Sequence, residues 1–239
     1  MALLSVSTPA PVLVGETDGT AFLPMLGHEL RVPLTALKGQ IQLMQRRMRR
    51  ESGRETDLDD LQRAAYQVER LSHQLDIILD ASHLLRDHFV LRPVVADLGP
   101  LVTRIVASQR AASSRHQVSL DMPASALIGS WDETRISHVL REIIANAIRF
   151  SPRGGHVQVR AVREGRAVRV EVADEGIGVP EDERETIFDY GTRAANTASF
   201  GGVGLGLYVA REIIVRHGGA IGVAPAPGGG SILWFTLPL

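Results

Sequence analysis

The chain has 239 residues, 44% of them hydrophobic, so it is long enough for one large domain or two smaller ones with a sizeable core. Its formal net charge of -1 gives no reason to expect nucleic-acid or anionic-membrane binding, and the absence of cysteine excludes disulfides, thiolate zinc sites and a cysteine nucleophile. Because no apolar run reaches the roughly 18 residues of a membrane span, and the start lacks a basic signal segment, we expect a cytoplasmic chain without a membrane segment.

Residues 1–19 are expected to form a flexible leader, and a long first helix is predicted from about residue 20 to 50. Its apolar residues recur at alternating three- and four-residue steps; they are Leu26, Leu30, Leu34, Leu37, Ile41, Met44 and Met48. At about 100° per residue, His28 lies on the opposite, exposed face, with Glu29 beside it and Pro33 one turn later, where it bends the helix. An exposed imidazole beside a carboxylate suits an acceptor or a base. The same pattern also fits a surface histidine on a bundle helix.

A second helix is predicted to start near Thr56 or Asp57, whose side chains suit an N-cap. Its apolar residues are Leu58, Leu61, Ala65, Val68, Leu71, Leu75, Ile78, Ser82 (a polar member of the series) and Leu85. Two such helices with a short connection form an antiparallel hairpin, and two hairpins pack as a four-helix bundle that covers both apolar stripes. We therefore expect a homodimer. The alternative is that a second domain covers the stripe.

After about residue 88 the sequence alternates between short strands and helices. Strands are predicted at 89–95, 118–120, 126–128, 157–162, 167–173, 220–224 and 231–237. Helices are predicted at 98–111, 131–150 and 205–217, with a helical turn at 181–187 and a loop at 189–203. This order predicts an α+β sandwich, a mostly antiparallel sheet with helices on one face, over residues 89–239. Residues 20–88 then form the helical hairpin domain, and residues 86–96 the hinge between the two.

The first stretch of this second domain that suggests a ligand is residues 146–152, near the end of a predicted helix. The amide oxygen of Asn146 suits a hard cation such as Mg²⁺, and Arg149, one turn later, suits a phosphate. Taken alone, Asn146 is more simply explained as a polar residue on an exposed face.

The second stretch is residues 174–178, directly after a strand. Asp174 can accept a hydrogen bond from an exocyclic amine, and Gly176 and Gly178 allow the backbone to approach a flat ligand. An ordinary β-turn has the same composition.

The third stretch is rich in glycine and opens the helix predicted at 205–217. Gly202, Gly204, Leu205 and Gly206 would present backbone N–H groups at a helix N-terminus, where phosphate binds. No Gly-Lys-Ser/Thr follows, and no parallel βαβ unit surrounds it, so neither a P-loop nor a dinucleotide-binding fold is predicted. Each stretch is weak alone, whereas the three in this order are strong.

The combination resembles the catalytic core of sensor histidine kinases of two-component signalling. That core is a dimerisation and phosphotransfer hairpin followed by a Bergerat-fold ATPase domain, and the resemblance covers residues 22–239. Residues 28–34 resemble the H box, residues 146–155 the N box, residues 174–178 the G1 box and residues 202–207 the G2 box. Residues 187–188 begin a segment similar to the F box.

The resemblance implies ATP and Mg²⁺ as cofactors, a response regulator as partner, and a mobile ATP lid at about 189–203. It implies that His28 is the phosphate acceptor, with Glu29 orienting the imidazole or taking its proton. The implied nucleotide-binding residues are Asn146, Arg149, Phe150, Asp174, Gly176, Gly178, Gly202, Gly204, Leu205 and Gly206. Asn146 and Glu142 are the implied metal ligands.

Four positions depart from the family pattern. Glu142 stands where the family usually has a second Asn, Arg149 replaces a common Lys, and residues 189–193 replace the usual aromatic run. Val32 stands four residues past the histidine, where a Thr or Asn is linked to orienting water in the phosphatase reaction. Because valine cannot hydrogen-bond water, we expect kinase activity with weak phosphatase activity. The competing hypotheses are a dimeric nucleotide-binding scaffold and another Bergerat-fold ATPase.

Overall fold

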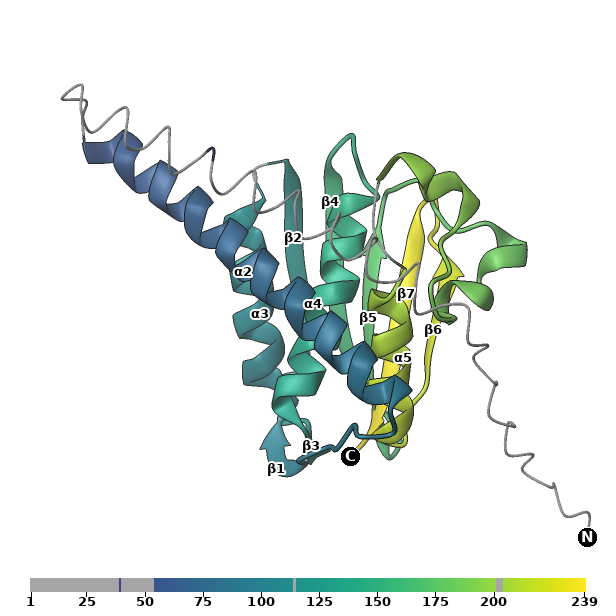
Figure 1. Ribbon diagram of the computed structural model, residues 1–239. Coiled ribbons are helices and arrows are strands. Elements are labelled where there is room, and N and C mark those ends of the chain that lie inside the picture. The colour runs from purple at the N-terminus through teal and green to yellow at the C-terminus, as the bar shows by residue number, and fades with distance from the viewer. Residues whose placement is uncertain (1–38, 40–53, 114, 201–203) are drawn as a thin grey trace, which may run out of the picture.

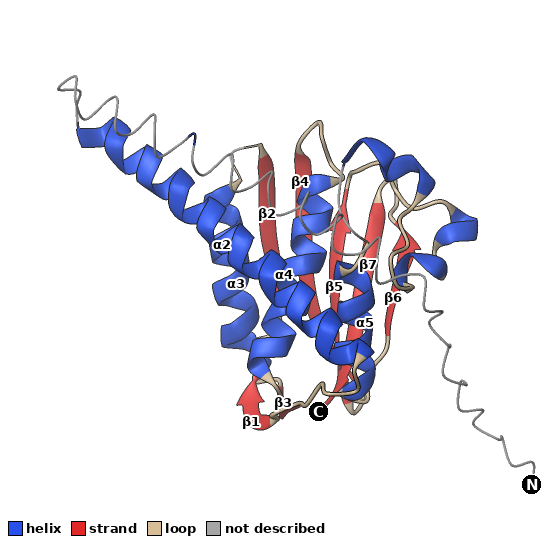
Figure 2. Cartoon of the chain, viewed as in Figure 1, coloured by secondary structure: helices blue, strands red, loops and turns tan. Residues whose placement is uncertain are grey.

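The computed structural model describes residues 39, 54–113, 115–200 and 204–239, so His28, Glu29, Val32 and Gly202 lie outside the described residues. One long helix is followed by a mixture of strands and shorter helices (Figures 1 and 2). The helices are α2 (Arg54–Leu85), α3 (Leu98–Ala112), α4 (Glu133–Arg149) and α5 (Gly206–Arg216). The strands are β1 (Val94–Asp97), β2 (His116–Asp121), β3 (Ile128–Trp131), β4 (Gly155–Glu164), β5 (Ala167–Asp174), β6 (Ile221–Pro225) and β7 (Ser231–Pro238). Short 3-10 helices span Glu181–Glu183, Thr186–Phe188 and Ala195–Phe200.

The main sheet within the described part of the chain has the strand order β2-β4-β5-β7-β6. Strands β2 and β4 are parallel, whereas the other three pairs are antiparallel. Strands β1 and β3 form a separate antiparallel pair. The mostly antiparallel α+β architecture expected from the sequence is therefore confirmed.

Side-chain alternation along β5 places one strand end at the functional site. Val168, Val170 and Val172 are all fully buried, because alternate residues of a strand point to the same face of the sheet. Asp174 continues this alternation and is also buried, at 6% exposure. The same alternation that buries the valines of β5 therefore places the carboxylate of Asp174 at the end of the strand, on the face of the sheet that the helices cover.

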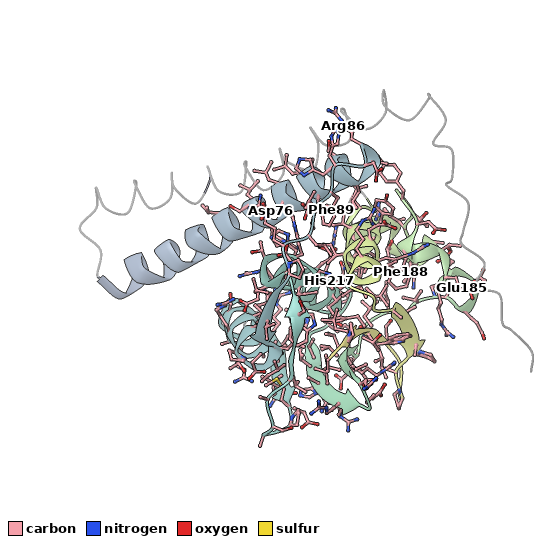
Figure 3. All side chains as sticks on the ribbon, turned by 90° about the horizontal axis from the view of Figure 1, so that it is seen from below. Asp76, Arg86, Phe89, Glu185, Phe188 and His217 are labelled. Atoms are coloured by element: carbon pink, nitrogen blue, oxygen red, sulfur yellow. The ribbon has the colours of Figure 1, made fainter. Side chains whose placement is uncertain are left out.

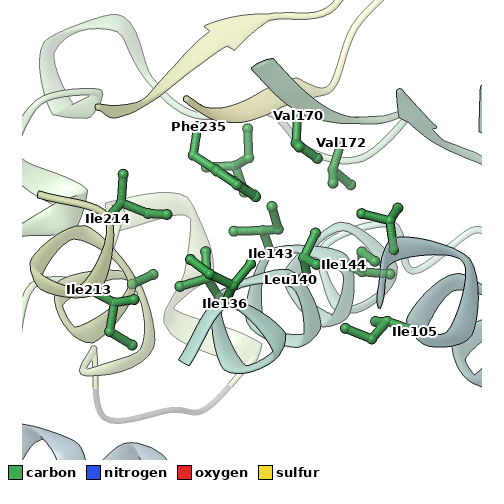
Figure 4. Close-up of a cluster of buried hydrophobic side chains, with 14 of the residues drawn as sticks. Ile105, Ile136, Leu140, Ile143, Ile144, Val170, Val172, Ile213, Ile214 and Phe235 are labelled. Atoms are coloured by element: carbon green, nitrogen blue, oxygen red, sulfur yellow. The ribbon is translucent and has the colours of Figure 1, made fainter. Parts of the chain in front are cut away.

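The hydrophobic core lies between this face of the sheet and the layer of α3, α4 and α5 (Figure 2). Figure 4 shows Leu140 and Ile143 of α4 pointing towards the sheet, on the side where Val170 of β5 and Phe235 of β7 lie. The buried face of α4 also includes Asn146, near its C-terminus, at 7% exposure. Packing of the apolar stripe therefore fixes which face of α4 reaches the site.

Helix α2 lies outside this layer, and its C-terminal half crosses α4 and α5 (Figures 1 and 3). Its side chains that join the core of the second domain are Ile77, Ala81 and Leu84. At about 100° per residue, Val68, Leu75 and Leu79 lie on the opposite face of the helix. Their exposed fractions are 48%, 44% and 54%. The second domain thus covers one apolar face of α2 and leaves the other uncovered.

The strand expected at 89–95 is wrong for most of its length, since β1 begins only at Val94. Pro93 has no backbone N–H to donate to a ladder, and the N–H of Arg92 donates instead to Oδ2 of Asp132 (2.9 Å). Val90 and Val95 are 70% and 78% exposed, so their apolar character does not reflect burial in a sheet.

Other element boundaries shift by a few residues. Helix α2 begins at Arg54, slightly before the expected N-cap. The strand expected at 126–128 starts at Ile128 and runs to Trp131, which had been placed at the start of a helix; Asp132 is the N-cap of α4 instead. The loop expected at 189–203 contains a 3-10 helix, Ala195–Phe200. Of the described helices, none is both long and apolar enough to cross a bilayer.

Candidate functional site

A single cavity brings together most of the residues that the sequence singles out. Those that line it are Glu142, Asn146, Arg149, Phe150, Asp174, Gly178, Gly204, Leu205 and Gly206. They come from the end of α4, the end of β5 with its following loop, and the start of α5. Gly176 lies next to this lining and contacts it through Asp174.

Asp174 is held rigidly by the backbone at the end of β5. Its Oδ1 accepts hydrogen bonds from the N–H groups of Gly176 (2.8 Å) and Ser231 (3.3 Å). Burial raises the pKa of Asp174, and these two hydrogen bonds oppose the rise without cancelling it. Because both donors use Oδ1, Oδ2 remains to accept from a ligand in the cavity.

The loop after Asp174 needs glycine because it passes close to the end of α4. A Cβ atom on Gly176 would collide with the carbonyl oxygen of Phe150 and lie 2.8 Å from Oγ of Ser151. The N–H of Ile177 donates to the same Phe150 carbonyl (3.0 Å). The loop is thereby joined to α4, and the carboxylate of Asp174 keeps a fixed position relative to that helix.

Glu142 and Asn146 form a polar pair on one face of α4. Nδ2 of Asn146 donates to Oε1 of Glu142 at 2.9 Å, as residues four apart on a helix can. Asn146 is therefore buried and bonded, and the simpler explanation of it as a residue on an exposed face is wrong.

The carboxyl group of Glu142 is held in its charged form. Burial alone raises the pKa of Glu142, but the hydrogen bond and charge of His73, the hydrogen bond of Asn146 and the charge of Arg149 together lower it. A charged carboxylate beside an amide is a donor set that suits a hard divalent cation.

The N-terminus of α5 lies against Glu142. Gly204 has a φ of +71°, which favours glycine, and Gly206 is the first residue of the helix. A Cβ atom on Gly206 would collide with the carboxylate of Glu142. The first-turn N–H groups of a helix bind anions, so this end of the cavity suits phosphates.

Arg149 connects α4 to the 3-10 segment Ala195–Phe200. Its Nε and Nη2 donate to the carbonyl oxygen of Phe200 at 3.2 and 2.5 Å. The rings of Phe150 and Phe200 meet edge to face, with centroids 5.3 Å apart. In this arrangement the guanidinium expected to meet a phosphate holds the end of the segment Ala195–Phe200 instead.

Several lining residues have no counterpart among those predicted. Two groups come from residues 192–197 and from β7; they are Thr192, Arg193, Ala194, Thr197, Ser231 and Leu233. A third group, Gln74, Ile77 and Ile78, comes from α2. The apolar series expected on α2 includes only Ile78 of these three, and no motif linked this face of the helix to the cavity.

Comparisons with known proteins agree with this geometry. Residues 131–239 match the family model of the histidine kinase-, DNA gyrase B- and HSP90-like ATPases, and residues 20–86 match the His Kinase A (phospho-acceptor) domain. The adaptive-response sensory kinase SasA of Thermosynechococcus vestitus is 31% identical over 224 residues, which are 91% of this chain and 59% of SasA. The chain carries a sensor histidine kinase catalytic core. It spans about three-fifths of the length of that relative.

Solved histidine kinases have the same fold as this histidine kinase core. The Acinetobacter baumannii histidine kinase AdeS is 25% identical, with a TM-score of 0.57 over 88% of this chain and 97% of that one. The histidine kinase ThkA, solved in complex with the response regulator protein TrrA, is 24% identical with a TM-score of 0.59. That match covers 93% of this chain and 61% of that one. The ATPase family model matches residues 131–239, the range that holds all the lining residues of the cavity except those of α2.

Proposed function

We propose that this chain is an ATP-dependent protein-histidine kinase, which phosphorylates itself on His28 and passes the phosphoryl group to an aspartate of a response regulator. The observation that carries the proposal is the meeting of Asp174, the Glu142–Asn146 pair and the N-terminus of α5 in one cavity. The phospho-acceptor domain that matches residues 20–86 supplies the acceptor. We further propose that residues 20–88 and 89–239 are the two functional units, with the hinge at residues 86–96.

In this proposal Asp174 accepts a hydrogen bond from the exocyclic amine of adenine, and the first turn of α5 binds the phosphates. Glu142 and Asn146 fit Mg²⁺, which takes one or two protein oxygens and completes its shell with phosphate and water oxygens. In keeping with this, the described residues hold no cluster of three or more His, Asp or Glu that could bind a metal. When bound, Mg²⁺ would neutralise charge on the phosphates.

The chemical step moves one phosphoryl group between two nucleophiles. An imidazole nitrogen of His28 attacks the γ-phosphorus, the bond to the β–γ bridging oxygen breaks, and ADP leaves. The attacking nitrogen is the unprotonated one of the neutral imidazole, and the proton on the other ring nitrogen then passes to Glu29 or to water. The remaining work is positioning, because the transferred group needs the acceptor and leaving oxygen in line. A donor that is ATP also implies a cytoplasmic place of action.

A labelling experiment tests the first step. Wild type incubated with γ-labelled ATP and Mg²⁺ should acquire an acid-labile label, and His28→Ala should acquire none. His83→Ala, at an exposed histidine of α2, is the matched control and should be labelled like wild type. Nucleotide binding without any label would support the scaffold alternative, and an acid-stable label would support another Bergerat-fold kinase.

We propose a homodimer because α2 leaves Val68, Leu75 and Leu79 exposed on the face away from the ATPase domain. A first helix and a second hairpin packed on this face would bury the stripe. Light scattering at micromolar concentration should give twice the monomer mass, and Leu75→Glu with Leu79→Glu should give a monomer. A monodisperse wild-type monomer would contradict the proposal.

Transfer to a regulator and its reversal are tested with a phosphorylated partner. Labelled kinase mixed with its cognate receiver domain should pass label to an aspartate of that domain. Because Val32 offers no hydrogen bond to water, we expect the wild-type chain to dephosphorylate the regulator weakly and Val32→Thr to do so faster. Rapid dephosphorylation by wild type would overturn the phosphatase part alone.

A further inference from the structure

Helix α2 of the hairpin contributes side chains to the ATP cavity as well as to the core. Gln74, Ile77 and Ile78 line the cavity, and His73 reaches the carboxylate of Glu142 on α4. These residues lie on the covered face of α2, opposite the exposed stripe at Val68, Leu75 and Leu79. A second hairpin can therefore pack on α2 while His73 stays at the ATP cavity.

The donor and the acceptor in the contact between His73 and Glu142 can be assigned. Nε2 of His73 lies 3.3 Å from Oε2 of Glu142, and the two side chains are 15% and 17% exposed. An ionised carboxylate only accepts hydrogen bonds, so Nε2 carries the proton and donates. Nδ1 of His73 is buried with no hydrogen-bond partner among the described residues, so the contact with Glu142 is the one hydrogen bond found for this ring there.

The bond from His73 is the first of two that orient the metal-binding side chains. Oε2 of Glu142 accepts from His73, and Oε1 accepts from Nδ2 of Asn146. With Nδ2 engaged on Glu142, the amide of Asn146 has its oxygen left for a ligand. The carboxylate of Glu142 also lies against Gly206, at the start of α5. A change in its position would therefore change the end of the cavity that suits phosphates.

We propose that His73 is a positioning residue for the Mg²⁺–ATP site, supplied to the ATPase domain by the hairpin. It fixes the carboxylate of Glu142 and, through it, the amide of Asn146, as outer partners of metal ligands do in other sites. The inference rests on the proposed function, because it requires that Glu142 and Asn146 hold Mg²⁺ with the nucleotide. It gives α2 a role in ATP binding that is separate from dimerisation.

The two sides of this coupling must affect each other equally. If docking of α2 strengthens Mg²⁺ binding, then bound Mg²⁺–nucleotide must stabilise docking of α2 by the same factor. The hairpin would therefore hold the ATPase domain more firmly when the site is loaded. This consequence is measured on the protein without any phosphoryl transfer.

The test is a Mg²⁺ titration of the full chain in the presence of a fixed, saturating non-hydrolysable ATP analogue, followed by calorimetry. His73→Ala should weaken the apparent Mg²⁺ affinity by about 10- to 100-fold. It should leave binding of the analogue in the absence of Mg²⁺ within about twofold of wild type. His73→Gln, whose Nε2 also donates, should recover most of the affinity, which a purely structural histidine would not predict.

The matched control is His138→Ala. His138 forms ion pairs with Asp76 and Asp80 of α2 across the same junction, and its ring meets that of His73 edge to face, whereas the hydrogen bond to Glu142 comes from His73. Hydrogen exchange of residues 71–85 checks that α2 stays docked in each variant and that Mg²⁺–analogue slows exchange there in wild type. The control should bind Mg²⁺ like wild type.

The outcomes separate the inference from the proposed function. If wild type shows no Mg²⁺-dependent analogue binding, both fail. If wild type binds but His73→Ala binds Mg²⁺ equally well or more tightly, the positioning role alone is overturned. Equal weakening by His73→Ala and by a docked His138→Ala would also overturn it, because the effect would then belong to the junction as a whole.

Discussion

The carboxylate of Asp80, on α2, forms an ion pair with the guanidinium of Arg135, on α4. The side chain of Asp80 is 2% exposed, and its second oxygen lies 3.2 Å from Nδ1 of His138. Phe89, just after α2, stacks on the same guanidinium at 4.8 Å; Figure 3 shows Phe89 and Asp76 where α2 meets the rest of the chain. A buried carboxylate is tolerated only when it is paired, so α2 is joined to α4 by a specific polar contact within an apolar one.

Removing Arg135 should lower the free energy of unfolding more than removing Asp80 does. Arg135→Ala leaves the buried Asp80 with His138 only, so we expect a loss of about 3 kcal/mol in the free energy of unfolding. Asp80→Ala leaves Arg135, which is 22% exposed and can reach water, so we expect a loss of about 1 kcal/mol. Urea unfolding followed by circular dichroism measures both.

The control for this pair is the exposed ion pair between Arg160 and Asp121. Nε of Arg160 lies 3.4 Å from Oδ2 of Asp121, and both side chains are more than half exposed. Asp121→Ala should change stability by less than about 0.5 kcal/mol. Equal losses for the two junction variants would show that Asp80 is not buried in solution.

A methyl group on Gly206 should impair ATP binding without unfolding the domain. In Gly206→Ala the new Cβ meets the carboxylate of Glu142, so either the carboxylate or the start of α5 must move. We expect affinity for Mg²⁺–ATP analogue to fall by about tenfold or more, about 1.4 kcal/mol. Gly39→Ala, at a helical glycine with nothing within 4 Å of the added Cβ, should bind like wild type. Wild-type affinity in Gly206→Ala would mean that Glu142 does not occupy this position.

Replacing His217 should lower stability through the N-terminus of α4. Nε2 of His217 accepts from the N–H of Asp132 at 3.0 Å, and its Nδ1 donates to the carbonyl of Ile213 at 2.7 Å. His217→Leu keeps the bulk but leaves a buried N–H unsatisfied, which costs about 1–3 kcal/mol. Differential scanning calorimetry should show Tm lowered by about 2–4 °C for each kcal/mol. An unchanged Tm would mean that water reaches the N–H of Asp132 in the variant.

Local sequence patterns predicted the parts of the site that follow from strand and helix periods. The alternation of β5 places Asp174 on the buried face, and Gly204 and Gly206 mark the start of α5, so both could be predicted without knowledge of the packing. Asn146 followed from its position near the end of α4, although its burial did not, because its neighbours are apolar on two sides of the helix.

The contacts of α2 could not be predicted from local patterns. Both faces of this helix carry apolar residues, so the period gives no choice between a partner hairpin and the ATPase domain. The bond between His73 and Glu142 joins residues 69 positions apart, and neither stands in a motif that names the other. Such pairing depends on how two preformed units pack, which only the tertiary structure determines.

Replacing Asp174 by Asn should raise the stability of the protein relative to wild type near neutral pH while weakening nucleotide binding. Because burial raises its pKa above the ordinary value of 3.8, the folded protein binds more protons than the unfolded chain between that value and the raised one. Stability of wild type is therefore reduced as the pH rises through this window. Asp174→Asn does not titrate at this position, so its stability relative to wild type should increase as the pH rises from about 3.5 towards neutrality.

The same variant should bind nucleotide poorly. In Asp174→Asn the new amide oxygen would keep the bonds from Gly176 and Ser231, but the NH₂ group would then face the adenine amine, two donors together. Loss of a hydrogen bond to a charged group costs about 1.5–3 kcal/mol, or about 10- to 100-fold in affinity. Urea unfolding across the pH range and calorimetry with the ATP analogue measure the two effects, with Glu175→Gln at the exposed neighbour as control. A variant that loses relative stability as the pH rises would show that Asp174 is stabilised in its charged form.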